Sequence, residues 1–282
     1  MKLIRFGPLH QETYGLLDAD GVRRDASSLL SGSPATAAEL PRVIEKLAAA
    51  NPSTLPPVPE ATRHGAPIPR PGKVVCIGLN YADHAAESGM DVPAEPVIFL
   101  KASNTVVGPF DDVLIPRGSR KTDWEIELGV VIGREARYLP SEAAAARCIA
   151  GYCVSHDVSE REFQLERGGQ WVKGKSCDRF NPLGPWLVTP DEFTDPDNAD
   201  LMLEVNGQRL QQGNTRTMVF NCTYLIHYLS QFMTLEPGDL ISTGTPPGVG
   251  LGQNPPRYLE AGDVVRLEIP GLGVQQQTFK PA

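Results

Sequence analysis

The stretch KTDWEIELGVVIG, residues 121–133, constrains this chain most, because it combines a core strand with two acidic side chains. Its apolar, β-prone residues predict a strand that enters the core: Leu128, Val130, Val131 and Ile132. Strand side chains alternate with a period of two, so Glu125 and Glu127 share one face. Two like charges on a half-buried face repel each other and are costly to desolvate.

A divalent cation between Glu125 and Glu127 would turn this repulsion into coordination. Carboxylate oxygens suit hard ions such as Mg²⁺, Mn²⁺ or Ca²⁺, whereas zinc prefers nitrogen and sulfur ligands. Asp157, in the sequence VSHDVSER, follows an apolar strand where a polar loop begins, and it is the best candidate for a third carboxylate. The alternative is a strand edge whose glutamates face water, and spacing alone leaves both open.

Composition narrows the class of protein. The chain has 282 residues, enough for one large domain or for a main domain with a small appendage. Its net charge of −8 provides no basic footprint for nucleic acid or for an anionic membrane surface. No apolar run approaches the roughly 18 residues of a membrane span, and the first residues lack the apolar core of a secretory signal. The five cysteines match no zinc spacing, so we expect a reduced, cytoplasmic protein.

The first 65 residues predict a small N-terminal α/β module with its linker. A β-meander with a hairpin at Asp20–Gly21 precedes a helix over residues 34–50. Residues 51–72 are crowded with proline and predict the linker. We therefore expect a module at residues 1–65 and a catalytic domain at residues 66–282.

The rest of the chain is strand-rich. Strands are predicted at residues 73–79, 96–103, 125–134 and 149–159, with a hairpin at Asn206–Gly207 and helices at residues 141–146 and 222–233. Ser141 is the expected N-cap of the first of these helices. These strands do not alternate with helices as βαβ units require. The pattern therefore predicts a β-rich α+β fold.

His84 and Glu87 could act as a pair. Three residues apart on a helix, they would share a face, and the carboxylate would fix the tautomer of the imidazole. Such a histidine is a general base able to activate water. The alternative is a surface histidine and glutamate that never interact, which the spacing alone favours slightly.

Two loops could line a pocket. The segment WVKGKSCDRFNPLGPW, residues 171–186, carries Lys175 and Asp178, and a lysine there could stabilise an oxyanion or enolate. A solvated loop lysine is the equal alternative. The segment STGTPPGVG offers backbone amides and the Thr245 hydroxyl to an anion. Phosphate-loop, GxSxG and HExxH motifs are lacking, which argues against nucleotide, serine-hydrolase and zincin sites.

Six ordered segments across residues 73–268 resemble the fumarylacetoacetate hydrolase superfamily: IGLNYADHAAE, KASNTVVGP, DWEIELGVVIG, HDVSER, KGKSCDRFNPLGPW and STGTPPGVG. The resemblance implies a mixed β-sheet roll, commonly homodimeric, with Mg²⁺ or Mn²⁺ as cofactor. It assigns the metal ligands to Glu125, Glu127 and Asp157.

The resemblance also implies roles for the remaining polar residues. The catalytic residues would be His84, Glu87 and Lys175. We expect substrate contacts from Arg161, Gln164, Asp178 and Thr245. One departure is His156, where many members have asparagine.

The activity implied is hydrolysis of a carbon–carbon bond in a 2,4-dioxo acid, giving pyruvate and a second acid. The N-terminal segment resembles bacterial members that hydrolyse 2,4-diketo-3-deoxy sugar acids, such as 2,4-diketo-3-deoxy-rhamnonate, and members named ureidoglycolate lyases. The superfamily also contains decarboxylases acting on oxaloacetate or acylpyruvates, and isomerases. A metal-stabilised binding protein without catalysis is the alternative from another class. The expected partners are a small 2-oxo acid and a second copy of the chain.

Overall fold

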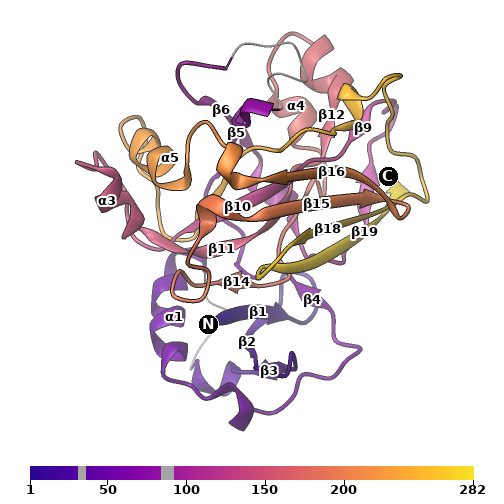
Figure 1. The fold of residues 1–282 in the computed structure, drawn as a ribbon. Helices are drawn as coiled ribbons and strands as arrows, with labels where there is room; N and C mark the ends of the chain where they lie inside the picture. Colours follow the sequence, from indigo (N-terminus) through magenta and orange to yellow (C-terminus); the bar gives the residue numbers. More distant parts are fainter. Residues whose placement is uncertain (31–35, 84–91) are drawn as a thin grey trace.

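The computed structural model describes residues 1–30, 36–83 and 92–282 (Figure 1). Within this part of the chain, the largest unit is a ten-stranded sheet, in which β4 (His64–Gly65) also pairs with β1. Its other strands follow the order β3 (Arg23–Asp25), β2 (Thr13–Leu17), β1 (Lys2–Phe6), β14 (Leu187–Val188), β11 (Ile149–His156), β10 (Ile126–Ile132), β17 (Leu240–Ser242), β5 (Val74–Gly78) and β6 (Val97–Lys101).

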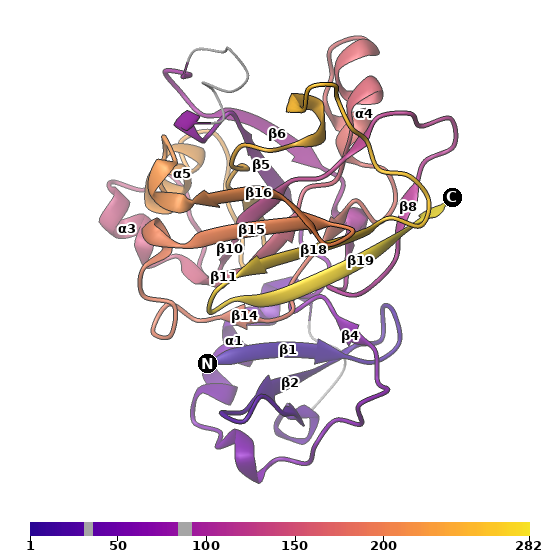
Figure 2. The same cartoon turned by 45° about the vertical axis from the view of Figure 1, so that its right-hand side comes forward.

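A five-stranded sheet lies across β10 and β11 (Figure 2). Its order is β16 (Gln208–Asn214), β15 (Asp200–Val205), β18 (Val264–Ile269), β19 (Gly273–Pro281) and β8 (Val113–Ile115). Two short pairs complete the strands: β12 (Ser159–Glu160) with β9 (Thr122–Asp123), and β13 (Asn181–Pro182) with β7 (Val106–Val107). Most pairs are antiparallel, but β17–β5, β19–β8 and β13–β7 are parallel. The predicted β-rich α+β fold with mixed sheets is therefore confirmed.

The described helices are short and lie around the sheets: α1 (Leu40–Ala48), α3 (Glu142–Ala146), α4 (Val172–Lys175) and α5 (Cys222–Leu229). The predicted cap at Ser141 is confirmed, because its side chain accepts a hydrogen bond from the amide of Ala144. The predicted hairpin at Asn206–Gly207 is also confirmed, with positive φ angles of 52° and 78°. No helix in the described residues is long and apolar enough to cross a membrane.

The N-terminal strands belong to the large sheet. β1 pairs with β14, with Lys2 opposite Val188 and Leu3 opposite Leu187. The proline-rich stretch contributes β4, which pairs with β1. In Figure 1 these strands and α1 lie at the lower end of the molecule, below β14.

Two apolar layers cover the two faces of the large sheet. Alternate residues of β10 enter the core between the sheets, where they meet β15, β18 and α5: Ile126, Leu128, Val130 and Ile132. Val131 points the other way, into a second cluster that includes residues of α1. Because strand side chains alternate, Glu127 lies on the Val131 face. The central strands thus carry the acidic side chains away from the core between the sheets.

We expect Leu203→Ala to lower the free energy of unfolding by about 2–5 kcal/mol, because Leu203 is fully buried between the sheets and its loss leaves a cavity. The matched control is Leu100→Ala in β6, where the side chain is 45% exposed. That change should cost less than about 0.5 kcal/mol. Urea unfolding followed by circular dichroism measures both, and equal losses would contradict the assigned core.

Candidate active site and metal centre

The pairing of β10 with β11 brings three carboxylates together. Glu127 lies opposite Ser155 and Ile126 opposite His156, so the next position pairs Glu125 with Asp157. The amide of Asp157 donates to the carbonyl oxygen of Glu125 at 3.0 Å. One ligand oxygen from each of Glu125, Glu127 and Asp157 lies within 4.8 Å of the others, and all three residues are buried. The structure thus assembles the predicted triad.

Buried cations surround this triad. The Lys175 ammonium lies 2.7 Å from Glu125 Oε2 and 2.8 Å from Asp157 Oδ2. Lys101 forms an ion pair with the other oxygen of Asp157, and Arg161 Nη2 donates to Glu125 Oε1 at 2.7 Å. Among the described residues, Glu127 has no cationic partner and accepts a hydrogen bond only from the amide of Gly244, at 2.9 Å. The positive charge is therefore concentrated on two of the three carboxylates.

This uneven distribution of cations shifts the pKa values of the two glutamates in opposite directions. Burial alone would raise the pKa of Glu125, but the charges of Lys175 and Arg161 outweigh it and hold that pKa far below its usual range. Burial and the negative charges of Asp157 and Glu125 raise the pKa of Glu127 well above its usual value. The nearby Lys175 charge and the Gly244 amide oppose this rise, but no cation of the described residues pairs directly with Glu127.

The donor set fits a hard divalent cation. Three carboxylates offer only oxygen ligands, which Mg²⁺ and Mn²⁺ prefer. Such an ion would also provide the positive charge that Glu127 lacks. Glu127 lies within β10, Glu125 directly precedes β10 and Asp157 directly follows β11, so the spacing of the triad is set by the register of these two adjacent strands.

Lys175 lies on a short helix and not in the irregular loop that the sequence suggested. It is the last residue of α4, which packs on the π-helical turn Glu162–Glu166. A Cβ at Gly174 would lie 2.3 Å from the carbonyl oxygen of Glu160. Only glycine allows α4 to approach this closely and so place Lys175 beside the carboxylates.

Arg161 is held by neighbouring side chains. Its Nε donates to Asp123 at 2.8 Å, and its Nη1 donates to Gln164 Oε1 at 3.1 Å. Asp123 also accepts hydrogen bonds from the amides of Gly250 and Leu251. Arg161 therefore ties Glu125, through Asp123, to the loop that follows Thr245.

Thr245 is also engaged within the protein. Its hydroxyl donates to the carbonyl oxygen of Ile126 at 2.8 Å and accepts from Gln211 Nε2 at 2.8 Å. The first contact anchors the STGTPPGVG loop on β10, beside Glu125 and Glu127, and the second ties the loop to Gln211 of β16.

A cavity of about 480 Å³ opens onto this cluster. Its described lining contains most of the polar residues singled out from the sequence: Glu125, Glu127, Arg161, Gln164, Lys175 and Thr245. Asp178 is exposed and does not line it. His84 and Glu87 lie outside the described residues.

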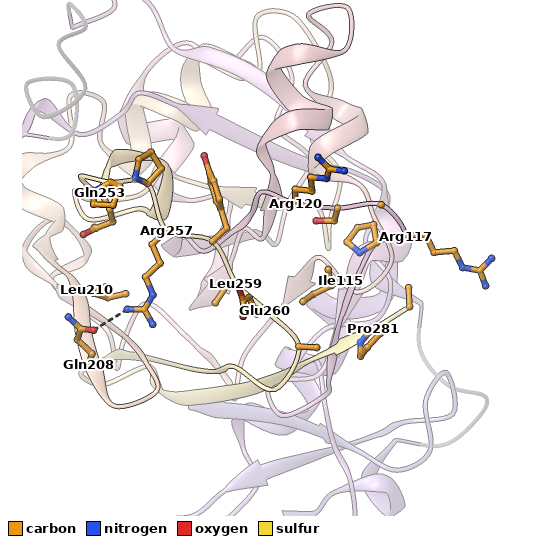
Figure 3. A pocket seen from close by; sticks show the side chains of 18 of the residues that line it. Ile115, Arg117, Arg120, Gln208, Leu210, Gln253, Arg257, Leu259, Glu260 and Pro281 are labelled. Carbon is orange, nitrogen blue, oxygen red and sulfur yellow. Dashed lines mark hydrogen bonds between the residues drawn. The ribbon is translucent and has the colours of Figure 1, made fainter.

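A larger cavity of about 1150 Å³ lies elsewhere (Figure 3). Arg117, Arg120 and Arg257 line it, and Arg257 donates to Gln208 at 3.0 Å. None of the residues that the sequence singled out for catalysis, metal or substrate lines it. We therefore assign the candidate site to the smaller cavity, where buried ionisable groups converge.

Two further residues near the site, His156 and Cys177, have surroundings that favour a structural role over a catalytic one. His156 is fully buried, and its Nδ1 lies 2.9 Å from Gln277 Oε1. Burial lowers the pKa of His156 to about 4, so the imidazole is neutral at physiological pH. Burial raises the pKa of the Cys177 thiol to about 11, which disfavours the thiolate that a nucleophilic cysteine needs.

Sequence reasoning missed Lys101, Asp123 and Trp171. Lys101 ends the apolar strand sequence PVIFLK, and a lysine at a buried strand position is a signal that could have found it. Asp123 and Trp171 carry no comparable local signal.

We expect Glu127→Gln to keep the fold, because the amide oxygen can still accept from Gly244, and to weaken Mn²⁺ binding by more than about 100-fold. Isothermal titration calorimetry with Mn²⁺ measures the affinity. The matched control is Glu162→Gln, whose carboxylate pairs with Arg167 near the surface. Unchanged Mn²⁺ affinity in Glu127→Gln would remove that residue from the ligand set.

Comparison with known proteins places this site in a family. Residues 73–280 match the family model described as fumarylacetoacetate (FAA) hydrolase C-terminal. A Burkholderia multivorans protein, provisionally named a hydrolase, is 57% identical, with 100% of both chains covered. Fumarylacetoacetate hydrolase from Exiguobacterium antarcticum superposes with a TM-score of 0.88 at 36% identity, again covering 100% of both chains.

A third similar protein was solved with ligands. Maleylpyruvate hydrolase from Sphingobium sp. SYK-6, in complex with manganese(II) and pyruvate, is 29% identical, with a TM-score of 0.83 and 100% of both chains covered. The family match covers most of the chain, and close relatives cover all of it. The chain therefore belongs to the fumarylacetoacetate hydrolase family.

Proposed function

We propose that this chain is a divalent-metal-dependent hydrolase that cleaves the carbon–carbon bond of a 2,4-dioxo acid, yielding pyruvate and a second carboxylic acid. The observation that carries the proposal is the buried triad of Glu125, Glu127 and Asp157 beside Lys175, at a cavity of about 480 Å³. Membership of a family of hydrolases and isomerases that act on 2-oxo acids supports it. The complex of the Sphingobium maleylpyruvate hydrolase with manganese and pyruvate supports the cofactor and the product.

Glu125, Glu127 and Asp157 would hold Mg²⁺ or Mn²⁺. When bound, the ion supplies a Lewis acid and a template for the carboxylate and 2-oxo oxygens of the substrate. Arg161 and Lys175 keep Glu125 ionised, and thus ready to act as a ligand.

The bond changes follow from the substrate. Water adds to the C4 carbonyl carbon, and the C3–C4 bond then breaks. The electron pair passes to the pyruvate fragment, which becomes an enolate and takes a proton at C3. The buried Lys175 ammonium stabilises the negative charge that develops along this path, because a fixed charge in a water-poor site needs no reorganisation.

For the general base we retain the sequence-based proposal. His84, oriented by Glu87, would take the proton from the attacking water. Both residues lie outside the described part of the chain, so the assignment stands on their spacing and on the family resemblance. The Gln164 amide nitrogen, which has no hydrogen-bond partner among the described residues, is available to a substrate oxygen.

Other reactions on the same scaffold are the alternatives. A decarboxylase, an isomerase or a ureidoglycolate lyase could use the same triad, and the family contains several of these reactions. The homodimer also stays a proposal, for which light scattering on the purified protein is the direct test.

The test of the proposed function is product analysis with purified protein, Mn²⁺ and acetylpyruvate. We expect loss of the enol absorbance, with pyruvate and acetate formed in equal amounts; lactate dehydrogenase measures the pyruvate. Removing the metal with EDTA should abolish turnover, and Mn²⁺ should restore it. Consumption of oxaloacetate with release of CO₂, while acetylpyruvate stays intact, would replace hydrolysis by decarboxylation.

We expect His84→Ala to lower kcat by about 10²–10⁴ while Mn²⁺ affinity stays unchanged, because a general base contributes to rate and not to metal binding. His227→Ala, on α5 and outside the cavity lining, is the control and should retain activity. Wild-type kcat in His84→Ala would rule out this histidine as the base.

A further inference from the structure

The lining of the candidate site is mostly apolar beyond its polar cluster. The described residues that complete it are Ile77, Gly78, Leu79, Phe99, Leu165, Trp171, Val249, Leu251 and Gly252. A 2,4-dioxo acid needs the polar cluster for its carboxylate and 2-oxo end. The group beyond C4 must then lie against the remaining wall.

No free cation faces this wall within the described residues. In the lining that the structure describes, the only cationic side chains are those of Arg161 and Lys175. Arg161 is paired with Asp123 and Glu125, and Lys175 is paired with Glu125 and Asp157. A second carboxylate on the substrate would therefore be desolvated without a counter-charge from the described lining.

Hydrogen-bonding capacity is also scarce in the described lining. The Thr245 hydroxyl donates its proton to the carbonyl oxygen of Ile126 and already accepts a hydrogen bond from Gln211. The Gln164 carbonyl oxygen accepts from Arg161, which leaves only its amide nitrogen. A substrate hydroxyl beyond C4 would find few partners here, and a site discriminates strongly against polar groups that it cannot pair.

The apolar wall is set by packing before any substrate arrives. The rings of Phe99 on β6 and Trp171, just before α4, meet edge to face, with centroids 5.2 Å apart at 62°. A Cβ at Gly78 would lie 2.9 Å from Cζ3 of Trp171, so a glycine at this position of β5 leaves room for the indole ring. Leu251, from the 3₁₀ turn Gly250–Gly252, adds an apolar side chain that is 39% exposed.

We infer that the substrate carries an uncharged, apolar alkyl or aryl group beyond C4, and that Phe99, Trp171 and Leu251 determine this specificity. The inference rests on the proposed function for the reacting end of the substrate. It departs from the hydroxylated sugar acid suggested by the resemblance, because the described wall offers a hydroxyl beyond C4 few partners.

The first experiment compares two substrates of equal length and a shorter one that carries a hydroxyl. With Mn²⁺ enzyme, kcat/KM is measured for 2,4-dioxooctanoate, for 2,4-dioxooctanedioate, which ends in a second carboxylate, and for 2,4-diketo-3-deoxy-rhamnonate. We expect 2,4-dioxooctanoate to be preferred by at least about 100-fold. An equal or higher kcat/KM for either polar substrate would overturn the inference.

The second experiment reverses the selectivity. Leu251→Arg adds a cation to the wall at a partly exposed position, and it should shift the kcat/KM ratio toward 2,4-dioxooctanedioate by at least about 10-fold. The matched control is Leu29→Arg, in another 3₁₀ turn and 41% exposed, which should leave the ratio unchanged. An unchanged ratio in Leu251→Arg, or an equal shift in both variants, would contradict the assigned wall.

A third measurement tests the binding specificity of the pocket independently of catalysis. N-butyloxamate and N-(3-carboxypropyl)oxamate, which have no C–C bond of the reactive kind, are titrated into Mn²⁺-loaded protein by calorimetry. We expect N-butyloxamate to bind at least about 10-fold more tightly. If it does while no dioxo acid is cleaved, the proposed function fails and the apolar specificity stands. If 2,4-dioxooctanedioate is cleaved best, the specificity fails and the proposed function stands.

Discussion

The structure of the site depends on one constraint: three carboxylates are buried close together at neighbouring strands, and their negative charge must be neutralised. Isolated, such a cluster would be strongly unfavourable, because desolvation and like-charge repulsion add. Lys101, Lys175 and Arg161 pair with Glu125 and Asp157, whereas no cation in the part of the chain that the structure describes pairs with Glu127. That remaining deficit is what a divalent ion would correct. The same arrangement explains why the cations around the site are not free to bind a second acidic group.

The scaffold turns this charge balance into a defined geometry. The β10–β11 register places Glu125 opposite Asp157, and the packed core between the sheets prevents the strands from slipping. Gly174 lets α4 approach closely enough for its last residue to reach both carboxylates. Asp123 accepts hydrogen bonds from Arg161 and from the amides of Gly250 and Leu251. It thereby joins the segment that carries Glu125 to a loop that lines the cavity. A substitution that disrupts any of these contacts would therefore alter the geometry of the triad, although it replaces none of the three carboxylates.

Much of the fold could be predicted because its elements have local signatures. The strand at residues 126–132, the Ser141 cap and the Asn206–Gly207 turn follow from side-chain periodicity, capping and backbone preference. The end of the last helix was less accurate: α5 ends at Leu229 and not at residue 233. Lys175 was expected in an irregular loop but ends a short helix, since its placement depends on the close packing of Gly174 against another segment.

By itself, the sequence determined that Glu125 and Glu127 share a strand face, since alternation needs no partner. The ordered motifs, with Asp157 and Lys175 among them, then identified the family. Only the tertiary structure decided that Lys101 reaches Asp157 across 56 positions, that Arg161 is tied to Asp123, and that Phe99 and Trp171 form one wall. These contacts join segments far apart in the chain, and no local period encodes which of them meet. The physical reason is that burial and ion pairing require contacts between distant segments, whereas the alternation of side chains is a property of a single strand.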